Sequence, residues 1–266
     1  MNSEHDYKTV NKDTWNEKTM AHLTSDFYDV EGFLKGKSSL NNIELNLLGD
    51  VKGKKILHLQ CHFGQDSLSL ARLGAQVIGI DISDVAIKNA KKLANTLELN
   101  TTFICCDLYE LPNYLDDTFD IVYTSYGTIG WLPDIEQWAK LISRFLKPKG
   151  EFVFVEFHPV VWMFNDTFDN IAYSYFKSEA IIETETGTYA DRSANITKKS
   201  ITWNHGLGEV LTALLQNNLQ LQSFEEFNYS PYNCFENTIE ISPKQFRIKS
   251  LENKIPMVYA LKAIKN

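Results

Sequence analysis

The sequence predicts an α/β fold, namely a doubly wound, seven-stranded and mostly parallel sheet whose last strand is antiparallel. From Lys54 onward, five short apolar runs alternate with helical patterns, which is the order expected of βα units. One more helical pattern and two more apolar runs complete the chain. A loop instead of a helix joins these last two runs, so they should pair antiparallel.

Each element of this fold can be placed from its sequence. The predicted strands are residues 55–60, 76–81, 101–107, 119–125, 151–157, 221–227 and 257–264. The predicted helices of the sheet domain are residues 66–74, 85–97, 135–146 and 208–219. Gly74 is a suitable residue to end the first of these helices. Ser83 or Asp84 can cap the start of the second helix, and Asp134 can cap the third.

Two segments add to the sheet domain, which should span residues 51–266. Residues 1–50 are expected to form an N-terminal helical cap of one or two helices. The buried anchors expected in this cap are Trp15, Phe27, Tyr28, Phe33 and Leu34. After the fifth strand, residues 159–206 are rich in aromatic residues, Thr and Ser and contain β-like runs, which predicts an inserted antiparallel hairpin or lid.

Composition excludes several classes of function. The formal net charge is -8 and the Lys and Arg residues are scattered, which disfavours nucleic acid as a partner. None of the four cysteines forms a CxxC pair, and no His/Cys cluster has zinc-ligand spacing, so we expect a reducing compartment and no metal. No apolar run approaches the roughly 18 residues of a membrane span. We therefore expect a soluble cytoplasmic protein, either a monomer or a homodimer, without a membrane partner.

The stretch from Ile56 to Ser83 carries the chemistry. A strand enters a tight turn, a helix leaves it, and Asp81 closes the next strand about twenty residues further on, which is the arrangement of a nucleoside-binding βαβ unit. The Asp81 carboxylate would accept hydrogen bonds from ribose hydroxyls. A purely structural role as a helix cap is the alternative, but Ser83 and Asp84 are better placed for capping.

At these residues the sequence resembles the class I S-adenosylmethionine-dependent methyltransferases. Their first motif reads roughly LDLGCGTG and aligns with LHLQCHFG here, in which Cys61 and Gly64 match. CCDLYELP resembles the third-strand motif, FDIVYTSYG the fourth, and FLKPKGEFVFVEF the turn into strand five. The resemblance covers roughly residues 50–158 and extends to a bacterial subgroup of uncharacterised small-molecule methyltransferases.

The resemblance implies that S-adenosylmethionine is the methyl donor and that a small molecule is the acceptor. Asp107 would bind the adenine amino group and Leu108 would lie against the ring. The donor-binding residues expected from the resemblance are His58, Gln60, Cys61, His62, Gly64, Asp81, Ile82, Asp107, Leu108 and Ser125.

The first motif departs from the family at three positions. His58 replaces an acidic residue that helps to fix the donor ammonium, and Gln60 and His62 replace two glycines. Side chains at the glycine positions would obstruct a pyrophosphate, so the loop disfavours a dinucleotide and tolerates S-adenosylmethionine, which has no phosphate. If either histidine holds the methionine tail, donor affinity should respond to pH near 6.5.

Two other functions compete with methyl transfer. A short-chain dehydrogenase that uses NAD(P) would explain the YxxxK pair Tyr173 and Lys177, but the glycine-rich TGxxxGxG loop that it needs is absent. A non-catalytic sensor or scaffold that binds S-adenosylmethionine would explain the residues at the glycine positions.

The candidate catalytic residues lie at the carboxyl ends of the fourth and fifth strands. Tyr126 follows strand four, whereas Glu156 and His158 end strand five, where they could position the acceptor or serve as a base. His205 is a weaker candidate of the same kind. The aromatic residues expected to form an acceptor pocket are Trp131, Trp162, Phe164 and Trp203. The identity of the acceptor and the choice among O-, N-, S- and C-methylation stay open.

Overall fold

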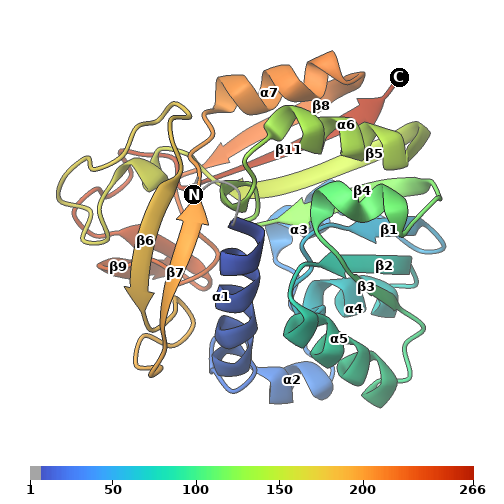
Figure 1. Ribbon diagram of the computed structural model, residues 1–266, viewed down its shortest axis with the longest axis horizontal. Helices are drawn as coiled ribbons and strands as arrows, with labels where there is room; N and C mark the ends of the chain where they lie inside the picture. Colours follow the sequence, from blue (N-terminus) through green and yellow to red (C-terminus); the bar gives the residue numbers. More distant parts are fainter. Residues whose placement is uncertain (1–6) are drawn as a thin grey trace.

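The computed structural model describes residues 7–266 and confirms the predicted sheet (Figure 1). Seven strands pair in the order β3-β2-β1-β4-β5-β11-β8, and β11 runs antiparallel to both of its neighbours. The strands are β1 (Lys55–His58), β2 (Gln76–Asp81), β3 (Thr102–Cys105), β4 (Phe119–Ser125), β5 (Leu146–Phe157), β8 (Leu219–Phe227) and β11 (Val258–Lys265). Because β11 follows β8 through a connection without a helix, it returns beside β8 in the opposite direction.

Helices cover both faces of this sheet. The α-helices are α1 (Tyr7–His22), α2 (Val30–Leu34), α3 (Asn42–Leu48), α4 (Gln65–Arg72), α5 (Asp84–Thr96), α6 (Ile135–Phe145) and α7 (Leu207–Gln216). The 3-10 helices of the described residues are η2 (Leu108–Asn113), η3 (Ile129–Trp131) and η4 (Val161–Met163). Leu57 and Phe152 pack with α6 and α7, whereas Ile56 and Val153, one position away on their strands, pack with α3 and α4. This alternation is what a sheet buried on both faces requires.

The predicted caps lie at the ends of the helices. The Ser83 side chain accepts a hydrogen bond from the Ala86 backbone N–H at the start of α5, and Asp134 accepts one from the Gln137 N–H at the start of α6. Gly74 follows the C-terminus of α4 with a φ of 93°, a conformation that favours glycine. These local signals fix where each helix begins or ends.

The N-terminal segment contains three helices in its described part, α1, α2 and α3, and not the one or two predicted; residues 1–6 lie outside the described part of the chain. Phe33 is buried as expected, whereas Trp15, Phe27 and Tyr28 are only partly buried. Leu34 is a correction, because its side chain is exposed at the end of α2. A five-residue helix buries only one side of its turn, and here that side carries Phe33.

The insertion after β5 is the predicted antiparallel hairpin, formed by β6 (Ile181–Thr186) and β7 (Thr197–Thr202). A second hairpin was not predicted. It is formed by β9 (Thr238–Ser242) and β10 (Gln245–Ile248), in a segment that the sequence analysis assigns to a loop. Its turn contains Lys244 at a φ of 58°, where a glycine would have signalled a hairpin.

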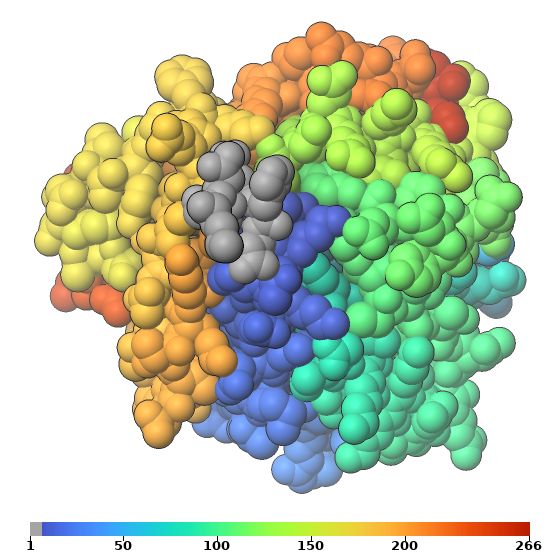
Figure 2. Space-filling model, viewed as in Figure 1, coloured from blue at the N-terminus to red at the C-terminus, as the bar shows by residue number. Residues whose placement is uncertain are grey.

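Helix α1 lies between the insertion and α5, as Figures 1 and 2 show. On one side, the Asn11 side-chain amide exchanges two hydrogen bonds with the Ile201 backbone, at 2.7 and 2.9 Å. On the other side, Asn16 Oδ1 accepts a hydrogen bond of 2.6 Å from the Ser83 hydroxyl. Helix α1 therefore joins the insertion to the edge of the sheet domain. Within residues 7–266, no helix is long and apolar enough to cross a membrane.

Candidate active site

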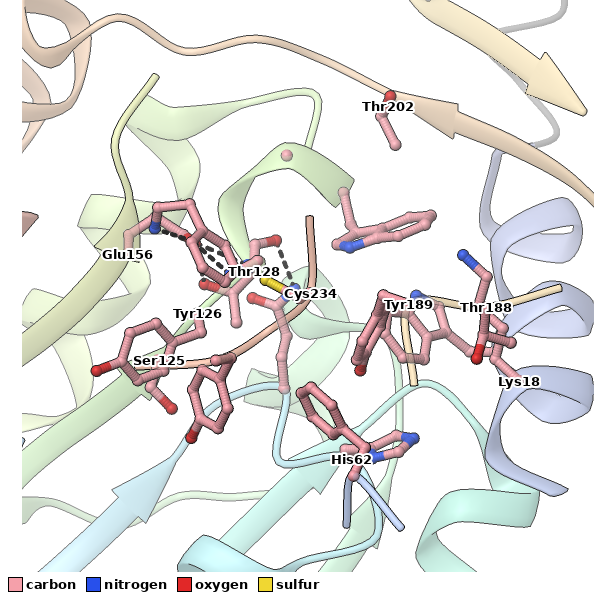
Figure 3. A pocket seen from close by; sticks show the side chains of 18 of the residues that line it. Lys18, His62, Ser125, Tyr126, Thr128, Glu156, Thr188, Tyr189, Thr202 and Cys234 are labelled. Carbon is pink, nitrogen blue, oxygen red and sulfur yellow. Dashed lines mark hydrogen bonds between the residues drawn. The ribbon is translucent and has the colours of Figure 1, made fainter. Parts of the chain in front are cut away.

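A cavity of about 990 Å³ lies at the carboxyl ends of the parallel strands (Figure 3). Its walls come from the sheet domain, α1, the β6–β7 insertion and the segment around the β9–β10 hairpin. All ten residues predicted to bind the donor line it, and so do Tyr126 and Glu156. The predicted aromatic residues Trp131, Trp162, Phe164 and Trp203 line it as well. Parallel topology explains this convergence, because the carboxyl ends of all these strands meet at one edge.

The loop after β1 adopts left-handed backbone conformations at three positions. The φ angles are 52° at Gln60, 51° at His62 and 82° at Gly64. At Gly64, a Cβ atom would lie only 2.7 Å from the Phe103 ring, so glycine is required there. The other two residues are not glycine and are held by hydrogen bonds: Gln60 Nε2 donates to the Thr128 carbonyl at 2.9 Å, and the His62 N–H donates to Asp81 at 2.8 Å. The loop thus keeps a glycine-like path while carrying two large side chains.

The His62 ring packs against the N-terminal cap. Its Nε2 lies 3.3 Å from Thr19 Oγ1 and 3.4 Å from His22 Nδ1. The ring also contacts Trp15 and Tyr28, with centroids 5.3 Å apart in both pairs. Burial lowers the pKa of His62 well below its usual value, so the ring is neutral near pH 7. His62 therefore fastens the loop to α1.

Asp81 ends β2 with its carboxylate buried at the cavity wall. One oxygen accepts the Ser83 N–H at 2.9 Å and the other accepts the His62 N–H at 2.8 Å. Burial raises the pKa of Asp81 to about 6, although these hydrogen bonds oppose the shift. A carboxylate has about four lone-pair sites, so each oxygen can still accept a hydroxyl.

Asp107 follows β3 and starts η2. It accepts the Tyr109 N–H at 3.0 Å and forms an ion pair with Lys8 of α1, also at 3.0 Å. Lys8 also donates to Glu110 at 2.8 Å. Helix α1 therefore reaches the part of the cavity that contains Asp107, where its Lys8 binds both Asp107 and Glu110.

Glu156 holds the loop that follows β4 (Figure 3). One oxygen accepts the N–H groups of Gly127 and Phe157. The other accepts the Thr128 N–H at 2.7 Å, the Thr128 hydroxyl at 2.9 Å and the Ile129 N–H at 3.2 Å. Burial raises the pKa of Glu156, and the hydrogen bonds counteract this effect. Both oxygens of the Glu156 carboxylate therefore already accept hydrogen bonds, most of them from the loop after β4.

Tyr126 begins the same loop at a φ of 45°. Its hydroxyl donates to Glu44 Oε2 of α3 at 2.9 Å, and its ring packs edge-on against Tyr232 with centroids 5.0 Å apart. Burial, reinforced by the Glu44 charge, raises the pKa of Tyr126 well above its usual value. The hydroxyl therefore stays protonated, and the ring forms one wall of the cavity.

His158 is a correction to the predicted catalytic set, because its side chain does not line the cavity. Its Nε2 lies 2.9 Å from Glu226 on β8, and its Nδ1 accepts the Val160 N–H at 3.2 Å. Its backbone N–H pairs with Met257, ahead of β11, at 2.9 Å. This pairing at the end of β5 directs the ring towards β8. The His205 ring also lies outside the cavity, and its Nε2 is 2.8 Å from the Leu132 carbonyl.

Sequence reasoning missed several side chains that line the cavity from distant elements. They are Tyr7, Asn11 and Lys18 of α1, Asp66 of α4, and Tyr232, Cys234 and Phe235 in the segment before β9. Lys18 is buried, pairs with Glu185 of β6 at 2.8 Å and lies over the Trp131 ring. Of these side chains, only Asp66 could have been proposed from the sequence, because it closely follows Gly64 of the first motif.

Comparison with known proteins agrees with this geometry. Residues 56–150 match the family model described as a methyltransferase domain. A ubiquinone biosynthesis O-methyltransferase of Coxiella burnetii is 30% identical over 135 residues, which are 50% of this chain and 57% of the relative. The chain thus spans little more than half the length of this relative.

Two solved structures share the fold. A S-adenosylmethionine-dependent methyltransferase from Mesorhizobium loti has a TM-score of 0.57 at 19% identity, covering 87% of this chain and 100% of that one. Geranyl diphosphate C-methyltransferase from Streptomyces coelicolor A3(2) has a TM-score of 0.62 at 14% identity, covering 98% of both chains. Residues 56–150 are therefore similar to a methyltransferase domain, and the chain has the fold of these two solved methyltransferases. The antiparallel β11 is the antiparallel last strand that the sequence predicts.

In the structure, the dehydrogenase-like residues Tyr173 and Lys177 do not form a pair. The Tyr173 hydroxyl donates to Glu183 of β6, whereas the Lys177 ammonium donates to the Pro133 carbonyl. Among residues 7–266, no group of three His, Cys, Asp or Glu side chains is arranged to hold a metal ion.

The electrostatics of the cavity predict how the affinity for the expected donor changes with pH. Burial lowers the pKa of His58 to about 3 and also lowers that of His62, so neither ring should titrate near pH 6.5. Asp81, with a pKa of about 6, is ionised at pH 7 and gains a proton at lower pH. Affinity for S-adenosylhomocysteine should therefore be constant from pH 7 to 8 and fall below pH 6, by up to about tenfold per pH unit.

Titration calorimetry at several pH values measures this profile. Asp81→Asn should remove the inflection near pH 6, whereas replacement of both His58 and His62 with Gln should leave it in place. An inflection that persisted in Asp81→Asn would assign the pH response to another group.

Proposed function

We propose that this chain transfers a methyl group from S-adenosylmethionine to a small-molecule acceptor. One observation carries the proposal: a β2-terminal carboxylate with spare hydrogen-bonding capacity faces a loop whose glycine positions hold Gln60 and His62. The carboxylate suits ribose hydroxyls, and the large side chains oppose a pyrophosphate. Gln60 Oε1 is buried without a hydrogen-bond partner among the described residues, which leaves an acceptor for a polar ligand group.

The predicted donor residues divide into three groups by position. Asp81 would accept the ribose hydroxyls, and Asp107 would accept the adenine amino group, with Ile82 and Leu108 against the ring. The methionine tail would lie along the loop from Gln60 to Gly64 and against Ser125. Since the bound donor supplies an already activated methyl group, the main task of the chain is to hold the acceptor in line with it.

The insertion at residues 159–206 is proposed as the acceptor lid over the main domain. Its cavity-lining aromatic side chains are Trp162, Phe164, Phe168, Tyr173, Tyr189 and Trp203. Tyr126 would shape the space next to the transferred methyl group, and Glu156 would act by positioning the loop that carries Tyr126. This lining favours an apolar, ring-containing acceptor that makes few polar contacts. The O-methyltransferase relative is consistent with a small molecule of this kind.

A cytoplasmic location of the protein stays a prediction.

Ligand-induced thermal stabilisation tests the donor class. S-adenosylhomocysteine at a hundred times its Kd should stabilise the protein by about 2.7 kcal/mol, which raises Tm by roughly 5–10 °C. NAD and NADP at the same concentration should not shift Tm, because the loop opposes their pyrophosphate. A shift with NADP and none with S-adenosylhomocysteine would overturn the proposal. Methyl transfer from labelled S-adenosylmethionine to a panel of acceptors then separates an enzyme from a sensor.

A further inference from the structure

The methionine tail of the proposed donor carries an ammonium group, and His58 does not provide its counter-charge. The His58 ring is buried, and its Nδ1 lies 2.8 Å from the Ser67 hydroxyl. The ring packs on Tyr123 with centroids 4.8 Å apart. Its environment keeps the imidazole neutral, so the charge must come from another residue.

Asp66 is a cavity-lining carboxylate whose neighbours are the hydroxyls of Ser39 and Ser125, with the Lys244 ammonium further away. The other carboxylates here already have partners. Asp81 accepts two backbone N–H groups, Asp107 pairs with Lys8, and Glu156 accepts hydrogen bonds from the loop after β4. In the described part of the chain, Asp66 has neither an ion-pair partner nor a backbone N–H donor. Its Oδ2 lies 3.5 Å from the Ser125 hydroxyl, which is a long hydrogen bond. A carboxylate in this state favours a bound cation.

The position of Asp66 matches the proposed course of the methionine tail. In the register of the sheet, His58 on β1 is opposite Tyr123 on β4. Gln60 and Ser125 each lie two residues further along the chain, at the carboxyl ends of these adjacent strands, and both line the cavity. Asp66, in the first turn of α4, reaches Ser125 from the other end of the same loop. Figure 3 shows Ser125 next to Tyr126 at the wall of the cavity.

Gln60 supplies a second acceptor in this corner. Its Nε2 is fixed by the Thr128 carbonyl at 2.9 Å, which orients Oε1 as the remaining polar atom of the amide. That oxygen is buried without a partner among residues 7–266. A carboxylate and an amide oxygen together suit an ammonium group, which has three N–H donors and no acceptor.

We propose that Asp66 binds the α-ammonium group of the donor, with Gln60 Oε1 as a second acceptor. The inference rests on the proposed function, because it assigns the ligand of this corner to S-adenosylmethionine. A structural role is the competing explanation, since an acidic residue in the first turn of a helix also stabilises that helix. Only the first role predicts that replacing Asp66 weakens ligands with an ammonium group more than ligands without one.

Calorimetry with two ligands separates these roles. S-adenosylhomocysteine carries the ammonium, whereas 5′-methylthioadenosine has the same nucleoside and a thioether but no amino-acid group. Asp66→Asn should weaken binding of S-adenosylhomocysteine by about tenfold or more, as expected for the loss of a charge-assisted hydrogen bond. It should leave the affinity for 5′-methylthioadenosine within about twofold, because that ligand never reaches Asp66.

Glu136→Gln is the matched control, because Glu136 is an exposed acid in the first turn of α6. It should change the affinity for neither ligand. If Asp66→Asn does not fold, Asp66→Ser, which keeps an oxygen at the start of the helix, replaces it. Equal losses for both ligands, or a loss for neither, would overturn the role of Asp66. If the wild-type protein bound neither ligand, the proposed function itself would fail, which is a distinct result.

Discussion

Replacing Asp81 with alanine should weaken S-adenosylhomocysteine binding by about a hundredfold or more. Loss of charge-assisted hydrogen bonds to the ribose costs about 1.5–3 kcal/mol, which corresponds to roughly ten- to over a hundredfold in affinity. The structure places the expected value at the upper end of this range. Asp81 also accepts the N–H of His62, whose backbone is left-handed, so alanine removes a hydrogen bond that holds the loop after β1 as well.

Calorimetry measures the affinity, and circular dichroism should show a native spectrum for the variant. Asp81→Asn keeps one acceptor oxygen and should cost less than the alanine variant. Asp116→Ala serves as the control, since Asp116 is an exposed acid on the loop before β4. If Asp81→Ala bound S-adenosylhomocysteine as tightly as the wild type, Asp81 would be a structural residue only.

Glu156→Gln should destabilise the protein by about 3 kcal/mol, which lowers Tm by roughly 6–12 °C. All the groups that face the Glu156 carboxylate are donors, namely the N–H groups of Gly127, Thr128, Ile129 and Phe157 and the Thr128 hydroxyl. Glutamine replaces one acceptor oxygen with an NH₂ group, so donors would face donors in a buried site. The loop that carries Tyr126 would lose its anchor.

Thermal unfolding of the variant beside Glu225→Gln checks this expectation. Glu225 is an exposed residue on β8, and its replacement should shift Tm by no more than about 2 °C. A Tm for Glu156→Gln equal to that of the control would show that the loop does not depend on this carboxylate. It would also return Glu156 to the set of candidate bases.

The outcome for the two residues at the end of β5 shows where sequence reasoning reaches its limit. Glu156 and His158 are equally polar, and both end a predicted strand, so the sequence predicted one role for both. In the structure, Glu156 turns to the β4 loop and His158 turns to Glu226 on β8. The partners lie 28 and 68 positions away along the chain, so no local pattern could have assigned them.

The same limit applied to the loop after β1. The sequence identified Gln60 and His62 as departures from a glycine motif and predicted that they disfavour a dinucleotide. It did not reveal that His62 packs against Trp15 and Thr19 of α1. It also did not reveal the β9–β10 hairpin, because the residue at positive φ in its turn is Lys244.

What the sequence by itself determined is the sheet, its order of elements, the helix caps and the position of Asp81 at the end of β2. These features depend on apolar periodicity and on capping residues within a few positions of one another, so a linear reading contains them. Only the tertiary structure decided which polar side chains face the cavity, and it did so through contacts such as that of Asn11 with Ile201, 190 residues apart. A buried polar group must find its hydrogen-bond partner wherever the folded chain presents one, and that choice is made in three dimensions.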